Sequence, residues 1–331
     1  MVLEDKGRPS GEKGPQGFLR GLPPWAGGLL MILMATAMWG SEGLPVRIAS
    51  RGGLPPEYLA LMRTSVAALL LAGVALYRDR SVLVPRRDDI GLLAFNGFLG
   101  VAICATGASV AMARIPIALT FLMINTAPLW VMALSRVFRG EPLTRLRLVA
   151  AALGLCGVWI ALGVGTAAGK ALDPLGAGAA LLTGFAYAVY VYNGSRATGR
   201  IDRFRLYVQT FVWGLFFLAL GVLPSRGLGP LLSAPAEAWL AAAYLGIFPT
   251  VGSFGLLMLA LKRISGTAAA IGSMAEIPFS MFWSWIFLGE KVGLSAALGG
   301  VLIVASVVLV STEPVPDPFP AKTPAKGSDP A

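Results

Sequence analysis

Apolar stretches, each about as long as a membrane-spanning helix, recur along almost the whole chain. A helix that crosses the hydrocarbon core needs roughly 20 mostly apolar residues. Only 13% of the 331 residues are charged, whereas a soluble domain carries roughly 25%. The mean hydropathy is +0.73. The sequence therefore predicts an all-α integral membrane protein that crosses the bilayer many times, with lipid covering most of its surface.

Charged residues, Pro and Gly divide the chain into ten predicted transmembrane helices. The first five are expected at residues 25–49, 58–77, 90–113, 117–137 and 147–165, and the second five at 175–192, 206–223, 239–261, 266–288 and 294–310. The two ends, 1–24 and 311–331, are rich in Gly, Pro and polar residues, which predicts disordered tails. Glycines such as Gly154, Gly157, Gly299 and Gly300 would let neighbouring helices approach closely.

The basic residues are distributed unevenly between the two sides of these helices. If the N-terminus is inside, twenty of the 27 Lys and Arg fall in cytoplasmic segments, six fall outside and Arg63 lies within a helix. This asymmetry agrees with the positive-inside rule and predicts that both termini are cytoplasmic. The net charge of +10 forms no long basic run. Membrane orientation therefore explains it better than binding to nucleic acid.

The chain also repeats itself. A single offset of 149 residues aligns Arg47 with Arg196, Arg114-Ile115 with Arg263-Ile264, and Gly140-Glu141 with Gly289-Glu290. One offset that serves three separate places indicates duplication, with repeats over 25–165 and 173–310. Because each repeat holds an odd number of helices, the second is expected to insert upside down. Such inverted repeats are a recurrent plan of secondary transporters.

Short motifs lie within or just after particular predicted helices. They are Trp39-Gly40-Ser41 in the first, Pro128 with Arg139-Gly140-Glu141 after the fourth, Leu245 through Thr250 with Leu261-Lys262-Arg263-Ile264-Ser265 after the eighth, and Leu288-Gly289-Glu290 after the ninth. In this order they resemble the EamA family of the drug/metabolite transporter superfamily, over about residues 25–310. The resemblance implies a ten-helix transporter of the cell (inner) membrane that moves amino acids, metabolites or drugs, frequently outward.

The chain departs from that family pattern at two acidic residues. The family commonly has a small amide residue where this chain has Glu42, and a Glu-Pro pair where Ile277 separates Glu276 from Pro278. Both departures bear on the class of solute rather than on the fold.

Glu276 is the first candidate for a transport role. An ionised side chain in the hydrocarbon region costs at least ~2.5 to 3.5 kcal/mol, so such residues usually face a cavity or a partner. Glu276 lies about eleven residues into its helix, near mid-membrane at ~1.5 Å per residue. Pro278 removes a helix hydrogen bond beside it. We interpret Glu276 as a proton-titrating or cation-binding group; the alternative is a Glu that only hydrogen-bonds two helices together.

Glu42 and Arg63 form the second candidate. They lie on consecutive helices at similar depth, and pairing would lower the cost of burying both charges. The functional interpretation is an outer gate or a binder of a zwitterionic substrate. The structural interpretation is a permanent clamp between the first two helices.

Other polar and aromatic residues complete the candidate site. Amides and aromatic rings suit a cavity for an amphipathic solute, although Tyr and Trp are also common at membrane interfaces. The residues chosen as binding candidates are Asn125, Tyr187, Tyr190 and Trp283, from a wider set that also holds Asn96, Thr126, Gln209, Thr250, Ser253, Trp130 and Trp285. Glu141 and Glu290 are expected to be structural, capping the following helix or pairing with Arg145 and Lys291.

The residues that are missing narrow the function further. The chain has no His, which removes Ser-His-Asp and Cys-His catalysis and His-ligated metals or haem, and no cofactor is expected. It also lacks a GxxxxGK[ST] loop, which argues against a nucleotide-driven pump. Cys104 and Cys156 fall in apolar segments and are expected to pack. The favoured function is a secondary active transporter driven by a proton or solute gradient, not an enzyme.

Two alternatives stay open at this point. One is a membrane enzyme or lipid-handling protein, and the other a receptor or scaffold that transports nothing. The expected partners are a small-molecule solute and the lipid bilayer, and the sequence specifies neither the solute nor an oligomeric state.

Overall fold

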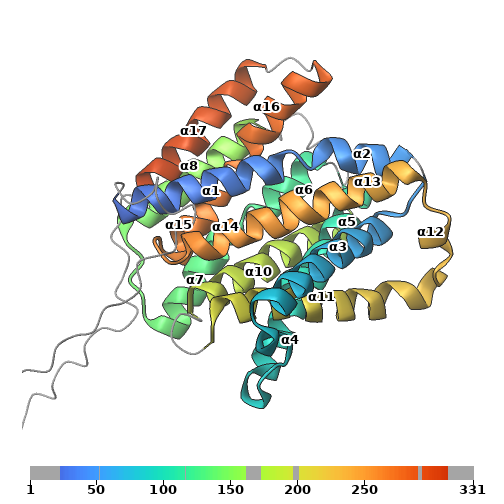
Figure 1. Cartoon of the computed structure of the whole chain (residues 1–331). Coiled ribbons are helices and arrows are strands. Elements are labelled where there is room, and N and C mark those ends of the chain that lie inside the picture. Colours follow the sequence, from blue (N-terminus) through green and yellow to red (C-terminus); the bar gives the residue numbers. More distant parts are fainter. Residues whose placement is uncertain are drawn as a thin grey trace, which may run out of the picture.

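The computed structural model describes residues 23–51, 53–115, 117–161, 173–196, 201–289 and 293–311, and over these residues it contains helices and no strand (Figure 1). The helices are α1 (Pro24–Gly40), α2 (Gly43–Arg51), α3 (Pro56–Arg78), α4 (Ile90–Gly97), α5 (Cys104–Arg114), α6 (Ile117–Ile124), α7 (Ala127–Arg139), α8 (Arg145–Ala161), α10 (Pro174–Arg196), α11 (Arg203–Arg226), α12 (Gly229–Leu232), α13 (Ala236–Leu245), α14 (Ser253–Ala260), α15 (Gly266–Ser273), α16 (Glu276–Leu288) and α17 (Leu294–Ser311). Apart from residues 23, 24 and 311, the predicted tails lie outside the described residues, and so does Glu290.

Six helical stretches in this part of the chain are long and apolar enough to cross a membrane, and 25–40 and 294–310 are shorter apolar helices. Each of the ten predicted segments is mostly helical over its described residues. The prediction of ten continuous helices is wrong at the first, fourth and ninth, which are interrupted at 41–42, 125–126 and 274–275. In each case a proline follows closely.

Proline explains the three interruptions. Pro45, Pro128 and Pro278 lack the N–H that a helix would pair with the carbonyl four residues earlier. Those carbonyls belong to Ser41, Ile124 and Met274, which lie at or immediately beside the breaks.

The third and eighth predicted helices are continuous but contain wider turns. A π-helix over Phe98–Ile103, named η4, joins α4 to α5, and another over Gly246–Gly252, named η6, joins α13 to α14. Pi-helical turns are rare and occur frequently at functional sites. These two occupy nearly corresponding positions under the 149-residue offset.

The same offset relates other local structures. Gly140 and Gly289 end α7 and α16 with left-handed φ angles of 66° and 65°, a conformation that Gly adopts without steric cost. The breaks in the fourth and ninth helices also correspond. The break at Ser41 and Glu42 does not, because its counterpart at residues 190–191 lies within the uninterrupted α10.

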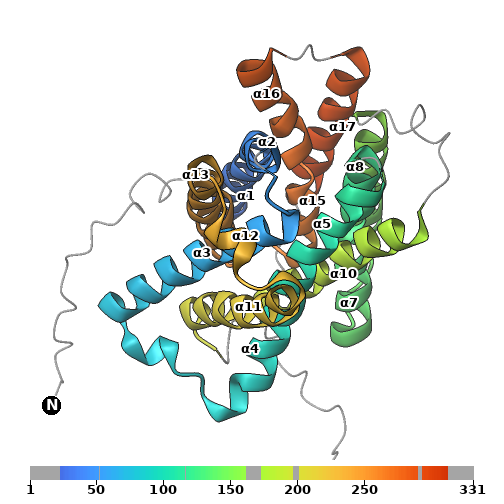
Figure 2. The ribbon, with the colours of Figure 1, turned by 90° about the vertical axis from the view of Figure 1, so that its right-hand side faces the viewer.

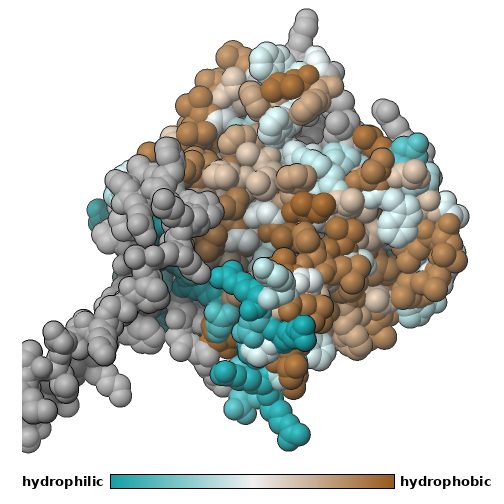
Figure 3. Space-filling model, viewed as in Figure 1, coloured by the Kyte–Doolittle hydropathy of each residue, from teal (hydrophilic) through white to brown (hydrophobic). Residues whose placement is uncertain are grey.

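The helices pack in pairs that the offset also relates. Helices α8 and α17, which occupy corresponding positions, pack along each other at one edge of the molecule (Figure 2). Helices α3 and α11 correspond too, and they pack antiparallel against each other. Large apolar side chains cover much of the outer surface (Figure 3), including Leu69, Leu220 and Leu240. Hydrophilic residues gather over the end of α3 and its connection to α4.

The α8–α17 contact depends on glycine. A Cβ added at Gly157 would lie 2.8 Å from the carbonyl oxygen of Gly299 and 2.9 Å from the backbone nitrogen of Ile303. Both neighbours are backbone atoms, which cannot swing aside.

We therefore expect Gly157→Val to destabilise the folded protein by about 1–3 kcal/mol through overpacking. Thermal unfolding in detergent, followed by the loss of monodisperse protein, measures this effect. Gly221→Val is the matched control, because a Cβ at Gly221 meets nothing within 4 Å. Equal unfolding midpoints for the two variants would contradict the close packing.

Candidate functional site

The break after α1 is stabilised by side chains. Apolar surroundings offer no water for backbone carbonyls that lose their helical partner. Three carbonyls in the last turns of α1 accept hydrogen bonds from side chains here: Ala35 O from Ser253 Oγ at 3.0 Å, Ala37 O from Trp283 Nε1 at 2.8 Å, and Met38 O from Ser41 Oγ at 2.6 Å. The interruption is therefore a built feature, held by α14 and α16 as well as by Ser41 itself.

Glu42 and Arg63 meet beside this break, as the sequence predicted. Arg63 donates from its two terminal nitrogens to the two carboxylate oxygens of Glu42, at 2.8 and 2.9 Å. This two-pronged pairing is among the stronger ionic geometries. The Arg63 and Glu42 side chains are 20% and 27% exposed, so the ion pair is mostly buried.

Arg63 has a third partner that lies on the π-helix η6. Its Nε and one terminal nitrogen donate to Thr250 Oγ1 at 3.1 and 3.0 Å. The Thr250 hydroxyl in turn donates to Leu245 O at 2.8 Å. A nearby hydrogen bond of 2.8 Å joins Ser41 Oγ and the Tyr244 hydroxyl. The first, second and eighth helical segments are thus tied together by polar side chains at one level.

Glu276 is the first residue of α16 and is half-buried. The start of a helix presents backbone N–H groups and the positive end of the helix dipole, which favour a carboxylate. Asn125, at the break in the fourth helix, donates from Nδ2 to Glu276 Oε1 at 3.3 Å and to Phe121 O at 3.0 Å. The same amide therefore caps α6 and contacts Glu276.

The end of α1 lies directly against the backbone of Glu276. A Cβ added at Gly40 would be 2.9 Å from Glu276 O and 2.7 Å from the backbone nitrogen of Ser280. The break in the first helix thus packs on the first turn of α16, while Asn125 approaches from the fourth. All three interrupted helices meet around Glu276.

Aromatic residues lie on one side of this meeting point. The Tyr187 hydroxyl lies 2.6 Å from Ser273 Oγ. Because Ser273 donates to Ala269 O, Tyr187 is the donor. Trp39 packs edge-on against Tyr187 and Phe254, with ring centroids 6.1 and 5.2 Å apart.

Tyr190 joins the same group of rings only through Phe254, at 5.3 Å. Its ring packs against Gly100 in the π-helix η4. Its buried hydroxyl has no hydrogen-bond partner among the residues that the structure describes. Glu276, Asn125, Ser273, Tyr187 and Trp39 together are named the Glu276 cluster, and Tyr190 lies outside it.

Other candidates occupy different places. Trp283 on α16 donates from Nε1 to Ala37 O on α1 and so joins the two helices. Asn96 is buried and bonds Thr210 and Asn193, and Gln209 donates to the carbonyls of Val82 and Leu83. Trp130 and Trp285 are exposed on the outer surface. The sequence did not indicate Phe254 and Tyr244 as site residues, because an aromatic residue in an apolar span looks the same whether it lines a site or only packs.

The corner after α7 differs from its prediction. Glu141 pairs with Arg139 and Arg147, each at 3.1 Å, and not with Arg145. Its capping role is also wrong, since the Thr144 side chain accepts from the Arg147 N–H at the start of α8. Arg145 is the first residue of α8, whereas Arg147 is buried one half-turn later and faces Glu141. Glu290 and Lys291 lie outside the described residues.

Long apolar helices, with interrupted helices meeting around Glu276, are typical of polytopic membrane proteins of the transporter class. The profile of the EamA-like transporter family matches residues 26–163 and again 174–312. The chain belongs to this family, which confirms the resemblance drawn from its motifs.

Known relatives cover nearly the full length. The chain is 29% identical over 271 residues to "Uncharacterized transporter YdfC" of Bacillus subtilis, covering 82% of this chain and 86% of the relative. It is 24% identical to "Probable terminal-alkyne amino-acid exporter" of Streptantibioticus cattleyicolor, covering 89% and 97%. It is also 24% identical to "Pseudopaline exporter CntI" of Pseudomonas aeruginosa, covering 86% and 95%. A crystal structure of 21% identity shares the fold, with a TM-score of 0.71 over 86% of this chain and 96% of the other.

Proposed function

We propose that this protein is a secondary active transporter that exports a small organic solute by alternating access between two inverted repeats, residues 25–165 and 173–310. The observation that carries the proposal is the meeting of three interrupted helices at Glu276. Interrupted helices supply unpaired peptide groups and helix-terminal charge in the interior, where secondary transporters bind solutes and coupling ions.

The inverted arrangement has its own support. The π-helices, the breaks of the fourth and ninth helices and the Gly140 and Gly289 corners recur at one offset. The corresponding helices α3 and α11 run antiparallel. Together with the basic residues, this favours ten membrane passes in the bacterial inner membrane with both termini cytoplasmic.

The solute that this site suits is small, amphipathic and zwitterionic. Glu276 offers a carboxylate for an ammonium group or a proton, and Arg63 offers a guanidinium for an acid group. The rings of Trp39 and Tyr187 offer apolar contact. An amino-acid-like solute satisfies these three features, and one relative is named as a probable exporter of terminal-alkyne amino acids.

The Glu42–Arg63–Thr250 contact acts as the gate at the outer end in this proposal. It joins three helical segments from both repeats, so the repeats cannot separate there while it holds. Competition for Arg63 by the acid group of the solute would release Glu42 and open that end. Glu276 then couples the cycle by exchanging a proton for the solute's ammonium group.

Transport by everted membrane vesicles tests the proposal. A panel of amino acids, of their amides without a free acid, and of neutral metabolites is offered with and without an imposed pH gradient. We expect gradient-dependent accumulation of zwitterions only. If folded, inserted protein moves nothing across the panel, the transporter proposal fails and the receptor or scaffold interpretation takes its place.

A further inference from the structure

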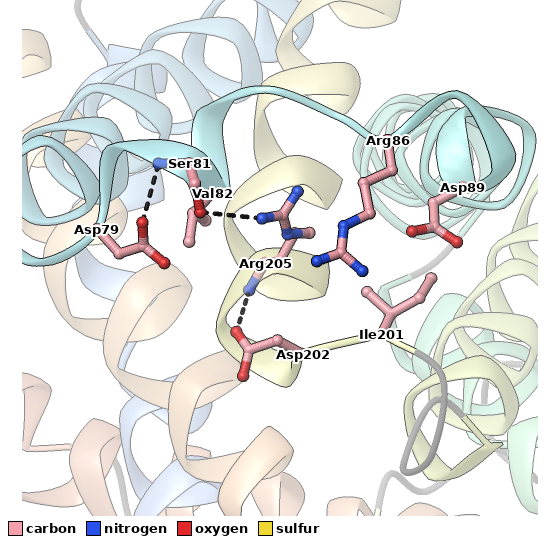
Figure 4. Close-up of a pocket in the computed structure, with 8 residues that line it drawn as sticks. All are labelled: Asp79, Ser81, Val82, Arg86, Asp89, Ile201, Asp202 and Arg205. Atoms are coloured by element: carbon pink, nitrogen blue, oxygen red, sulfur yellow. Dashed lines mark hydrogen bonds between the residues drawn. The ribbon is translucent and has the colours of Figure 1, made fainter.

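Two cavities of similar size lie at opposite ends of the α3–α11 pair. One, of about 260 Å³, lies where α3 ends and α11 begins and is drawn in Figure 4. The other, of about 210 Å³, lies where α3 begins and the chain leaves α11. We name them the charged cavity and the plain cavity. The charged cavity is separate from the Glu42–Arg63 pair, because Asp79 is sixteen positions beyond Arg63, about 24 Å along a helix.

The two cavities are built from corresponding parts of the chain. Under the 149-residue offset, Asp202 of the charged cavity corresponds to Gly53 of the plain one. Ser81 corresponds to Pro230 and Arg86 to Pro235 in the same way. The fold thus produces a hollow at each end, and only one of the two carries charge.

The charged cavity brings two guanidinium groups and three carboxylates together. Its lining residues are Asp79, Ser81, Val82, Arg86, Asp89, Ile201, Asp202 and Arg205. Figure 4 shows the Arg205 and Arg86 guanidinium groups between Asp79 and Asp202 on one side and Asp89 on the other. Charges are costly to bury unless they are paired, and Arg205 is only 8% exposed.

Arg205 is held by neutral groups. It donates to Val84 O at 2.9 Å and to Ser81 Oγ at 3.1 Å. Within the described chain no carboxylate lies within 4 Å of its guanidinium. Its charge is therefore available to an acid group inside the cavity, and the exposed Arg86 lines the same space.

Asp202 and Asp79 each accept a backbone hydrogen bond at the rim of the cavity. Asp202 Oδ2 accepts from the backbone N–H of Arg205, and Asp79 Oδ1 accepts from the backbone N–H of Ser81, both at 2.9 Å. The hydrogen bonds from Ser81 hold the pKa of Asp79 below its usual value. Each bond occupies one oxygen of its carboxylate, so a positively charged group has acceptors here.

We propose that the charged cavity is a second ligand site, which takes a small zwitterion with a primary ammonium group and a carboxylate or phosphate. The acid group binds Arg205 and Arg86, and the ammonium group binds Asp79 and Asp202. Such a ligand bridges the α3–α4 connection and the start of α11. Two sources share this chemistry, a free amino-acid-like solute and a phosphoethanolamine lipid headgroup. The inference does not rest on the proposed transport function.

Calorimetric titration of the delipidated full-length protein with glycine and with phosphoethanolamine tests the site. We expect at least one probe to bind, and Arg86→Gln and Arg205→Gln each to weaken binding about tenfold or more, as for lost charged hydrogen bonds. Arg86 is exposed, so its variant keeps the test valid if Arg205→Gln unfolds. Ser233→Ala, in the plain cavity, is the matched control and should bind as the wild type does.

The two sources separate in lipid nanodiscs. If phosphatidylethanolamine nanodiscs abolish probe binding and phosphatidylglycerol nanodiscs do not, the headgroup is the natural ligand. Equal binding of glycine in both identifies a free solute. The proposal is overturned if neither probe binds, if both Arg variants bind normally, or if binding is lost in Arg63→Gln and so belongs to the proposed transport site.

Discussion

Arg63→Gln is expected to lower solute transport at least tenfold while the protein still folds and inserts. The substitution leaves the Glu42 carboxylate and the Thr250 hydroxyl without their shared donor. Removing one partner of a buried pair costs about 3–5 kcal/mol, and we expect roughly 1–3 kcal/mol here because both side chains are partly exposed. A tenfold loss of rate corresponds to about 1.4 kcal/mol, so transport and stability must be measured on the same preparations.

A double variant separates a gate from a permanent clamp. If the pair is only a clamp, Glu42→Gln combined with Arg63→Gln removes the uncompensated charge and restores both stability and transport. If Arg63 also binds the solute, the double variant regains stability but not transport, which is the outcome we expect. Arg114→Gln is the matched control, since it breaks an exposed 3.3 Å pair with Asp173 that contributes little to stability.

The sequence predicted the Glu42–Arg63 contact because two charges on consecutive apolar helices have few other ways to be satisfied. It did not predict the bonds from Arg63 to Thr250. Those depend on the π-helix η6, which shifts the register of the eighth helix. Gly246 and Pro249 are within this turn, but neither residue type distinguishes a π-turn from an ordinary helix.

The helix interruptions were likewise predicted only in part. Pro278 pointed to opened backbone near Glu276, and the structure interrupts that helix. Pro45 is the same kind of residue in the first helix, where the sequence predicted no break. The contact between Asn125 and Glu276 joins residues from different repeats, and no local pattern encodes it. Trp283 was chosen for its ring, yet its N–H caps Ala37, a partner that only the packing of α16 on α1 reveals.

Glu276→Gln is expected to abolish accumulation driven by a pH gradient. Gln keeps the size of the side chain and an acceptor for Asn125, but it cannot gain or lose a proton. The start of α16 still presents its N–H groups to the neutral amide. Folding is therefore expected to change little, and exchange of solute across vesicles without a gradient is expected to persist.

This pattern distinguishes a coupling role from a structural one. A Glu that only joins two helices would lose exchange and gradient-driven accumulation together, in proportion to the loss of folded protein. A coupling Glu loses accumulation alone, and the exchange rate of its Gln variant no longer varies with pH. Glu237→Gln is the control, because Glu237 is exposed in the first turn of α13 and should leave both activities unchanged. Gradient-driven accumulation by Glu276→Gln at the wild-type rate would exclude Glu276 as the coupling group and leave the ends of the interrupted helices to bind the solute without it.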